Sequence, residues 1–412
     1  MSIRPALAAS YLQLADDAAR LYRLLGVVPG ESFPAPAVAA ATETPMEETR
    51  RLLNVLAEAS LLDDAFDGYR FASLVGLHAR EMAQEEESEQ ARQETVRRWV
   101  GWWLESARRA SHAVTPYRQI PVQEGGLEFG DKAQALDWME AEFRNLRAAA
   151  QAAHTAGLHE TAWNLVDAMW PLFLHRGLHA ERLEVDQLGL EAARACGDRA
   201  AEAQMLDRTG LSWRYLRRFE EANAAFQEAL TIWRALGNRR RVAGSHRRLG
   251  QVAMAQGYPS AAIGLFTTAI EVYREAGESR SQALGLADLG RAMIEDGRWG
   301  EAIPYLTQAQ DLLADTDDLY NLTRARILLG HAQLRDEVVA AGLRTMREFG
   351  SASGEALALQ SLGEIAMHAG RMKEALGYTK QASTVLAQMG TEPLDRLSRL
   401  IADIEVSLTA ES

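Results

Sequence analysis

Apolar side chains recur every three to four positions along most of the chain, and this spacing predicts α-helices almost throughout. The C-terminal two thirds also carries a longer repeat, in which every unit contains one marker glycine. The marker glycines are Gly210, Gly250, Gly290, Gly330 and Gly363, separated by 40, 40, 40 and 33 residues. Thirteen residues before them stand Gly197, Gly237, Gly277, Asp317 and Gly350, as expected of residues that end helices. Twelve residues after them stand Ala222, Ala262, Ala302, Gly342 and Ala375.

This repeat predicts units of helix, turn and helix stacked into an array. About six units run from Gly157 to Met389, with Trp170 in the place of the first marker glycine and a capping helix after them. Bulky residues follow the first four marker glycines at a fixed offset of sixteen, where we expect them to wedge between neighbouring helices. They are Phe226, Phe266, Leu306 and Met346.

The array resembles the tetratricopeptide family, whose helix pairs carry Leu-Gly in the first helix and an aromatic residue after the turn. The matching residues are Leu249-Gly250, Phe219, Trp299, Ala222, Phe226 and Ala229. The resemblance implies a right-handed superhelix that works by binding. The unit beginning at Asp317 departs most, because Asp336 to Val339 replace the expected turn, and we expect an altered pitch there.

The first 150 residues predict a winged-helix-like module followed by a helical bridge. We expect a helix over Ala6–Leu25, two helices over Pro36–Thr42 and Pro45–Ser60 with Thr44 as an N-cap, and a hairpin through Asp67-Gly68 whose first strand includes Leu61 to Asp64. Helices over Leu74–Ala83 and Thr95–Ala113, a linker or loop over Pro116–Gly130 and a helix over Ala133–Ala153 follow. The expected domains are 1–83, 84–156 with the loop 114–130, 157–389 and 390–412.

Several segments of this region resemble the C-terminal half of signal-transducing NB-ARC ATPases of the antibiotic-regulator type. They are Leu21 to Gly26, Leu52 to Leu56, Tyr69 to Phe71, Ala135 to Glu142 and Asn145-Leu146. In that family a nucleotide-binding module precedes a winged helix and repeats, so the resemblance implies a STAND-like regulatory protein of a GC-rich bacterium that begins where the ATPase ends. The family's His-Asp pair is replaced here by Ala72-Ser73, and no Gly-x-x-x-x-Gly-Lys-Ser/Thr loop is present. We expect no ATP binding by the family's mechanism, and no cofactor.

Composition sets the expected compartment and partners. The net charge of −13 argues against a surface devoted to nucleic acid or anionic membrane. No apolar run reaches the roughly 20 residues of a membrane span, and Cys196 is the single cysteine, so no intrachain disulfide is possible. We expect a cytoplasmic protein.

Catalysis finds little support in the sequence. The one close histidine pair, His175 and His179, straddles Gly177, and its spacing does not place both rings on one helical face. Neither a catalytic nor a metal-binding residue can be singled out, so we expect a protein that is not an enzyme.

The winged helix offers a possible DNA contact, but its charge argues against one. Its second helix sets Glu47, Glu48 and Glu58 against Arg50 and Arg51, whereas a helix that tracks phosphates needs a positive stripe. A packing role is the alternative interpretation.

A basic segment inside the array is the strongest candidate site. Ten arginines and His246 lie between Arg208 and Arg248, against three acids. Offsets of −6, −3, −2, +1, +4 and +5 from each marker glycine select the expected inner face. The candidate ligand-binding residues are Arg208, Arg214, Tyr215, Arg247, Arg248, Gln251, Arg291, Arg324, His331 and Arg335. Because guanidinium groups bind carboxylates bidentately, an acidic or C-terminal peptide is the favoured ligand and an anionic small molecule the next.

Two alternatives stay open for these arginines and for the protein. The arginines either form an anion-binding wall or pair with acids of adjacent helices, and pairing is the better hypothesis for Arg239–Arg241, expected in a loop between units. The protein is either a regulatory module that binds a protein, peptide or metabolite, or a winged-helix transcription factor with the array as its effector domain.

Overall fold

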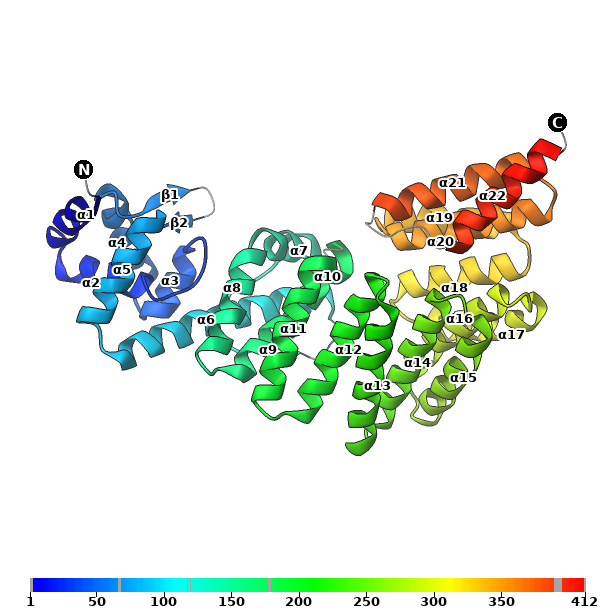
Figure 1. Ribbon diagram of the computed structural model, residues 1–412, viewed down its shortest axis with the longest axis horizontal. Coiled ribbons are helices and arrows are strands. Elements are labelled where there is room, and N and C mark those ends of the chain that lie inside the picture. The colour runs from blue at the N-terminus through cyan, green and yellow to red at the C-terminus, as the bar shows by residue number, and fades with distance from the viewer. Residues whose placement is uncertain are drawn as a thin grey trace. The chain divides into compact units, whose positions relative to one another are not determined.

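The computed structural model describes residues 3–65, 68–116, 118, 120–176, 179–388 and 395–410, and these are almost entirely helical (Figure 1). The chain divides into two compact units, Met1–Met205 and Leu206–Ser412. The predicted all-α class is confirmed.

The first unit begins with a winged-helix-like arrangement. Its elements are α1 (Ile3–Leu12), α2 (Asp16–Leu25), α3 (Ala35–Thr42), α4 (Met46–Glu58), β1 (Asp63–Ala65) and β2 (Gly68–Arg70). The strands are antiparallel, with Asp64 opposite Tyr69, and Tyr69 also forms a bridge with Phe33. The hairpin turn at Asp67 lies outside the described residues.

Two local predictions for this module are wrong. The helix expected over Ala6–Leu25 is two helices, because Asp16 and Asp17 occupy the first turn of a new helix, where carboxylates are stabilised by the helix dipole. Thr44 is not the N-cap of α4. That position is held by Pro45, and the Thr44 carbonyl accepts a hydrogen bond from the Thr49 hydroxyl instead.

The middle of the first unit contains α5 (Ser73–Glu86), α6 (Glu89–Val114), α7 (Lys132–Ala141) and α8 (Phe143–Thr155). The last two replace the single helix expected over Ala133–Ala153. The chain turns at Glu142, whose carboxylate accepts a hydrogen bond from the side chain of Asn145. Asn145 also accepts one from the backbone N–H of Glu31, so a contact distant in sequence holds this break in place.

The segment after α6 is a docked loop. Glu105 on α6 accepts a hydrogen bond from the backbone N–H of Gln123 at 2.8 Å, and Ser106 accepts one from Leu127 at 3.2 Å. Trp99 and Trp103 of α6 are fully buried in a core that extends from Leu7 to Met205. The module, the bridge and the first repeat helices therefore share one core.

The array starts in the first unit with α9 (His159–Ala168), α10 (Trp170–Arg176), α11 (His179–Ala195) and α12 (Arg199–Tyr215), which crosses the division between the units. The first helix of the first repeat is interrupted at Met169, just before Pro171, which has no N–H to donate to a helix. Gly177, between His175 and His179, lies outside the described residues.

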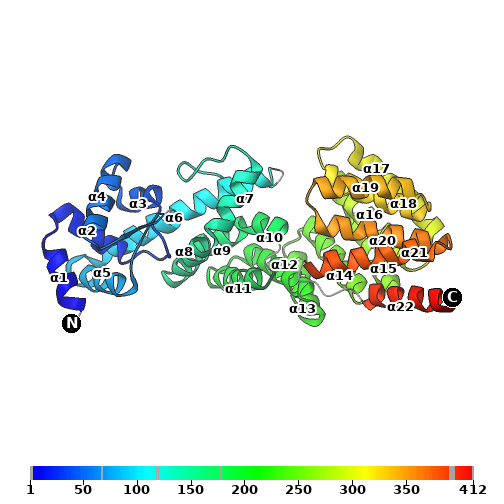
Figure 2. The ribbon, with the colours of Figure 1, turned by 90° about the horizontal axis from the view of Figure 1, so that it is seen from above.

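The second unit alternates first and second helices of the repeats. They are α13 (Phe219–Ala235), α14 (Arg239–Ala255), α15 (Pro259–Glu275), α16 (Ser279–Glu295), α17 (Trp299–Ala314), α18 (Leu319–Ala332), α19 (Asp336–Glu348), α20 (Ala352–His368), α21 (Met372–Gln388) and α22 (Asp395–Ala410). The first helices α14, α16, α18 and α20 lie side by side, and α22 packs on α21 (Figures 1 and 2). Met389 and Gly390, expected at the end of the repeats, lie outside the described residues.

Marker glycines let neighbouring helices approach closely. A Cβ atom added to Gly250 would lie 2.6 Å from the ring of Phe266, and one added to Gly210 would lie 2.7 Å from the ring of Phe226. Leu306 occupies the same position against Gly290. The predicted wedge is thus observed in three units.

The wedge prediction is wrong for Met346. Gly330 faces Val338 and Val339, whereas Met346 faces Gly354. The reason is the short turn, because α19 begins at Asp336, six residues after Gly330 (336 − 330 = 6), whereas α17 begins nine residues after Gly290 (299 − 290 = 9). In this unit, the residue sixteen positions after the marker glycine therefore does not contact that glycine.

A further correction concerns the basic run Arg239–Arg241. It forms the first turn of α14 instead of a loop, since the Asn238 side chain caps the helix by accepting a hydrogen bond from the backbone N–H of Arg241. Arg239 pairs with Glu275, and Arg240 Nε lies 3.2 Å from Glu278 Oε1. These two arginines therefore pair with acids, as the alternative interpretation expected.

Candidate functional site

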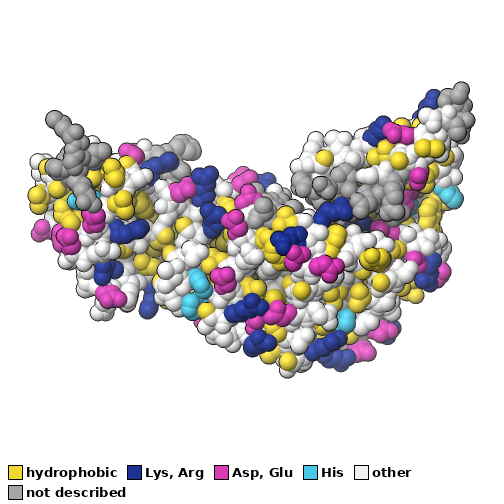
Figure 3. All heavy atoms as spheres, viewed as in Figure 1, with side chains coloured by type: hydrophobic (Ala, Val, Ile, Leu, Met, Phe, Trp, Pro, Cys, Tyr) yellow, Lys and Arg dark blue, Asp and Glu magenta, His cyan; other side chains and the backbone are white. Residues whose placement is uncertain are grey.

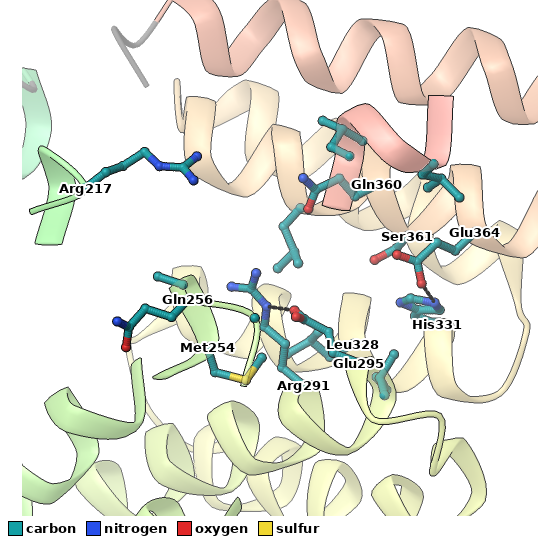
Figure 4. Close-up of a pocket in the computed structure, with 16 residues that line it drawn as sticks. Arg217, Met254, Gln256, Arg291, Glu295, Leu328, His331, Gln360, Ser361 and Glu364 are labelled. Carbon is teal, nitrogen blue, oxygen red and sulfur yellow. Dashed lines mark hydrogen bonds and ion pairs between the residues drawn. The ribbon is translucent and has the colours of Figure 1, made fainter. Parts of the chain in front are cut away.

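A pocket opens on the inner face of the second unit, between the first helices of successive repeats (Figure 4). Side chains of α14, α16, α18 and α20 form most of its wall, and α22 adds two leucines. The lining residues are Arg217, Met254, Ala255, Gln256, Gly257, Arg291, Ile294, Glu295, Leu328, His331, Leu357, Gln360, Ser361, Glu364, Leu397 and Leu400.

The pocket wall uses the helical positions selected for the inner face from the sequence. Arg291, His331 and Glu364 each follow their marker glycine by one residue, and Met254 and Ile294 follow theirs by four. Positions three and four apart share one face of a helix, so one repeat pattern places all of these side chains on the same surface.

Polar side chains in the pocket are arranged in close pairs. Arg291 Nε donates a hydrogen bond to Glu295 Oε1 at 2.9 Å, one helical turn along α16. The buried His331 has its Nε2 atom 3.3 Å from Glu364 Oε2, a contact that lacks hydrogen-bond alignment. Figure 4 shows both pairs facing the same cavity. The pocket therefore presents both signs of charge beside leucine side chains.

Arg217 enters the pocket from the turn between α12 and α13 (Figure 4). Its backbone is left-handed, with φ 58°, at a position where the next two repeats have Gly257 and Gly297. A left-handed non-glycine residue costs on the order of 1 kcal/mol or more, and such residues concentrate at functional sites. The sequence analysis did not select Arg217, although its place in a glycine column was visible.

Next to the pocket lies a set of four residues that we call the Asp288 cluster: Asp288, Arg247, Gln251 and Arg324. Arg247 Nε donates to Asp288 Oδ2 at 2.7 Å, and Gln251 Nε2 donates to the same oxygen at 2.9 Å. Arg324 Nη2 donates to Asp288 Oδ1. One buried carboxylate on α16 thus binds donors from α14 and α18.

Charge attraction keeps Asp288 ionised. Burial alone raises the pKa of the Asp288 carboxyl, but the guanidinium groups of Arg247 and Arg324 outweigh burial and hold that pKa well below its ordinary value. Burial lowers the pKa of Arg324, and Asp288 more than offsets it, so that pKa is raised. The cluster is therefore charged over the physiological range.

The neighbouring Arg248 points to a different acid. Its Nη1 atom lies 3.2 Å from Oδ1 of the buried Asp207, and Trp233 Nε1 donates to Asp207 Oδ2 at 3.2 Å. Arg247 and Arg248 thus turn to opposite sides, toward Asp288 and Asp207. The basic residues do not face the groove as one uninterrupted wall, and acidic and basic side chains also intermingle on the face that Figure 3 shows.

The other candidate residues are dispersed. The guanidinium of Arg214 lies 4.6 Å from the ring centre of Tyr215, which follows it at the end of α12. Arg335 pairs with Glu337 at 3.0 Å on an exposed turn. Burial lowers the pKa of the Arg241 guanidinium, and the positive charge of Arg208 contributes to that lowering. Of the candidates, the structure brings Arg247, Gln251 and Arg324 together in the Asp288 cluster, and Arg291 and His331 together in the pocket.

Asp288 and Glu364 are the acids that the sequence analysis missed. Both stand at inner-face offsets, Asp288 two residues before Gly290 and Glu364 one residue after Gly363. The offset rule therefore covers both positions, although neither acid was among the predicted site residues.

One histidine contact in the first unit was not predicted from the sequence. His154 and His159 flank the turn from α8 to α9, and their Nδ1 atoms lie 3.2 Å apart. Within the described part of the chain, no three histidine, cysteine or acidic side chains gather as a metal site.

Comparison with known proteins gives relatives among bacterial regulators. No family model matches the chain. The regulatory protein AfsR of Streptomyces coelicolor is 28% identical over 341 residues, which cover 79% of this chain and 34% of that protein. AfsR of Streptomyces griseus is 26% identical over 401 residues, which cover 95% of this chain and 40% of that protein. This chain is therefore similar to part of AfsR. It spans between a third and two fifths of the length of these relatives.

Similar solved structures support the fold. A Rap protein complexed with competence and sporulation factor has a TM-score of 0.51 at 12% identity, covering 87% of this chain and 99% of that one. The Rap conjugation gene regulator of the plasmid pLS20, in complex with the Phr* peptide, has a TM-score of 0.50 at 14% identity, covering 90% and 96%. The predicted tetratricopeptide-type array is confirmed. Among the described residues, no helix is both long and apolar enough to span a membrane.

Proposed function

We propose that this chain is a regulatory module that binds a peptide, free or part of a partner protein, in the inner-face pocket of the second unit. The pocket itself carries the proposal, because four successive repeats contribute side chains to it. Its wall alternates apolar groups such as Leu328 and Leu357 with hydrogen-bonding groups such as Gln360 and Arg291. A peptide needs both, since its backbone must form hydrogen bonds while its side chains lose water.

The comparisons support this proposal in part. The homologous segments belong to proteins named as regulators, and a Rap regulator of similar fold is described in complex with a peptide. We further propose that the module neither hydrolyses nucleotides nor catalyses another reaction. We propose that it acts in the cytoplasm and that its activity depends on whether the pocket holds a peptide. Bacterial transcriptional or signalling control is the process in which we place it.

The experiment is an affinity selection with a synthetic library of short random peptides that have free C-termini. The protein is incubated with the library, bound peptides are recovered by size exclusion, and mass spectrometry identifies them. We expect a set of related sequences to be retained by the wild-type protein and lost in Gln360→Trp, because the indole would fill the half-buried pocket. Gln227→Trp, on an exposed position of α13, is the matched control and should retain the same peptides.

Retention of the same peptides by both variants would contradict the proposed pocket. Retention of no peptide by any of the proteins would contradict peptide binding altogether. Circular dichroism of both variants checks that the helices are intact.

The alternative function, DNA binding by the winged helix, receives less support from the structure. On α4, Arg51 donates to Glu48 and to Asp17, and these carboxylates offset its charge. A gel-shift assay with genomic fragments at low and high salt tests this alternative, because phosphate contacts lose affinity steeply as salt rises. We expect no salt-sensitive shift.

A further inference from the structure

The Asp288 cluster carries an excess of positive charge at a partly buried place. Arg247 and Arg324 contribute two positive charges and Asp288 one negative charge, so the net charge is +1 (2 − 1). The side chain of Asp288 is 5% exposed, whereas those of Arg247 and Arg324 are 23% and 15% exposed. The carboxylate is therefore the interior member, and both arginine side chains are more exposed than it is.

Donor capacity remains after Asp288 has been bound. Arg247 donates to it through Nε and Arg324 through Nη2, whereas each guanidinium has five N–H groups in a fixed planar fork. Asp288 thus fixes the positions of both guanidinium groups before a ligand binds, which reduces the conformational entropy that binding would cost.

The cluster and the pocket are adjacent on the same helix faces. Asp288 precedes Arg291 by three residues on α16, Arg324 precedes Leu328 by four on α18, and Gln251 precedes Met254 by three on α14. Residues three or four apart are neighbours on a helix surface. On each of these three helices, a cluster residue therefore lies one turn before a residue of the pocket wall.

We infer that the Asp288 cluster binds a carboxylate of the peptide while the pocket holds an adjoining apolar side chain. This inference rests on the proposed function and specifies its ligand. A carboxylate matches a guanidinium fork in shape and offsets the excess charge, which is poorly screened at a half-buried site. The apolar requirement follows from Met254, Leu328, Leu357 and Leu400 in the pocket wall.

The carboxylate has two possible sources in a peptide, its C-terminus and an Asp or Glu side chain. Each peptide retained in the affinity selection is therefore synthesised as the free acid, as the C-terminal amide, and with Asp and Glu replaced by Asn and Gln. Removing the carboxylate that the cluster binds should weaken binding at least about tenfold, the effect of losing one charge-assisted hydrogen bond.

A variant of the protein locates the effect. Arg247→Gln keeps a donor near Asp288 and lowers the net charge of the cluster to zero (1 − 1). We expect it to weaken the carboxylate form at least about tenfold, and to abolish most of the difference between the carboxylate and neutral forms. Arg239→Gln, at the first residue of α14, should change neither form. Arg324→Gln serves as a second variant if Arg247→Gln does not fold, as judged by circular dichroism.

Equal binding of the carboxylate and neutral forms to the wild-type protein would overturn the inference while leaving the peptide pocket in place. An equal loss for both forms in Arg247→Gln would overturn it as well, because the arginine would then be structural. Saturation-transfer NMR with N-acetyl-leucine and N-acetyl-leucinamide tests the cluster with probes that do not come from the selection. Stronger transfer to the acid, reduced in Arg247→Gln, supports the inference, and equal transfer to both overturns it.

Discussion

Replacing Gly250 by alanine tests the helix contact that defines the repeat. The new Cβ atom would lie 2.6 Å from Cε1 and 2.9 Å from Cδ1 of Phe266, well inside the ordinary carbon contact of about 3.5–4.0 Å. Phe266 is only 1% exposed, so its ring can move only by displacing other core residues. Overpacking of this kind costs about 1–3 kcal/mol.

Alanine also favours the helix, which opposes part of that cost. The gain over glycine inside a helix is about 1 kcal/mol, so the net destabilisation expected for Gly250→Ala is about 0–2 kcal/mol. Gly264→Ala is the matched control, because Gly264 lies within α15, is exposed, and has no other atom within 4 Å of an added Cβ. The control should be stabilised by about 1 kcal/mol, so the two variants should differ by about 1–3 kcal/mol.

Urea denaturation followed by circular dichroism measures this difference. The comparison holds if both variants keep the wild-type denaturant dependence, since otherwise the shift of the midpoint does not report stability alone. Phe266→Leu combined with Gly250→Ala should recover part of the loss by shortening the facing side chain. If both alanine variants shift the midpoint upward by the same amount, Gly250 is not a contact residue and the reasoning is refuted.

Three further predictions concern ligands, packing and acid. Saturating ATP or ADP should not raise the thermal midpoint, whereas a ligand at 100 times its Kd would add about 2.7 kcal/mol; a reproducible shift in a thermal melt would contradict this. Ala262→Leu and Ala302→Leu, at fully buried positions, should each cost about 1–3 kcal/mol in urea denaturation, and wild-type stability in both would count against the assigned contacts. Because the folded-state pKa of Asp288 is lowered, the stability that its ionisation contributes is fully present above an unfolded pKa of about 3.9 and is lost as pH falls below it. Asp288→Asn should therefore lose less stability between neutral pH and pH of about 3 than the wild type, and equal losses in acid titrations would contradict the assignment.

The fold could be predicted from the sequence because the repeating residues contact each other within one helix pair. The spacing between Gly250 and Phe266 is repeated by Gly210 and Phe226, and each pair meets within one helix pair. The breaks inside helices could not be predicted in this way. The turn at Glu142 depends on Asn145 reaching the backbone of Glu31, a contact across 114 residues that no periodic pattern records.

The sequence predicts which face of the helices forms the candidate site, but not which side chains pair with each other there. The offsets identify the face that lines the pocket, since a helix repeats its directions along its length. They do not say which acid each arginine meets. Arg247 pairs with a residue 41 positions later (288 − 247 = 41) and Arg248 with one 41 positions earlier (248 − 207 = 41), so two adjacent arginines join opposite neighbours. Consecutive side chains of a helix point in directions about 100° apart, so the two arginines meet different neighbouring helices.

The Asp288 cluster also bears on how the array opens. In a linear array each repeat is stabilised mainly by its neighbours, so the ends unfold first and opening proceeds inward. Asp288 joins α14 and α18 through α16, so detaching α14 or α18 removes one of the two arginines that compensate this buried carboxylate. Native-state hydrogen exchange should therefore show α14, α16 and α18 opening as one cooperative block, later than α21 and α22. In Asp288→Asn that block should separate into single repeats with distinct opening free energies.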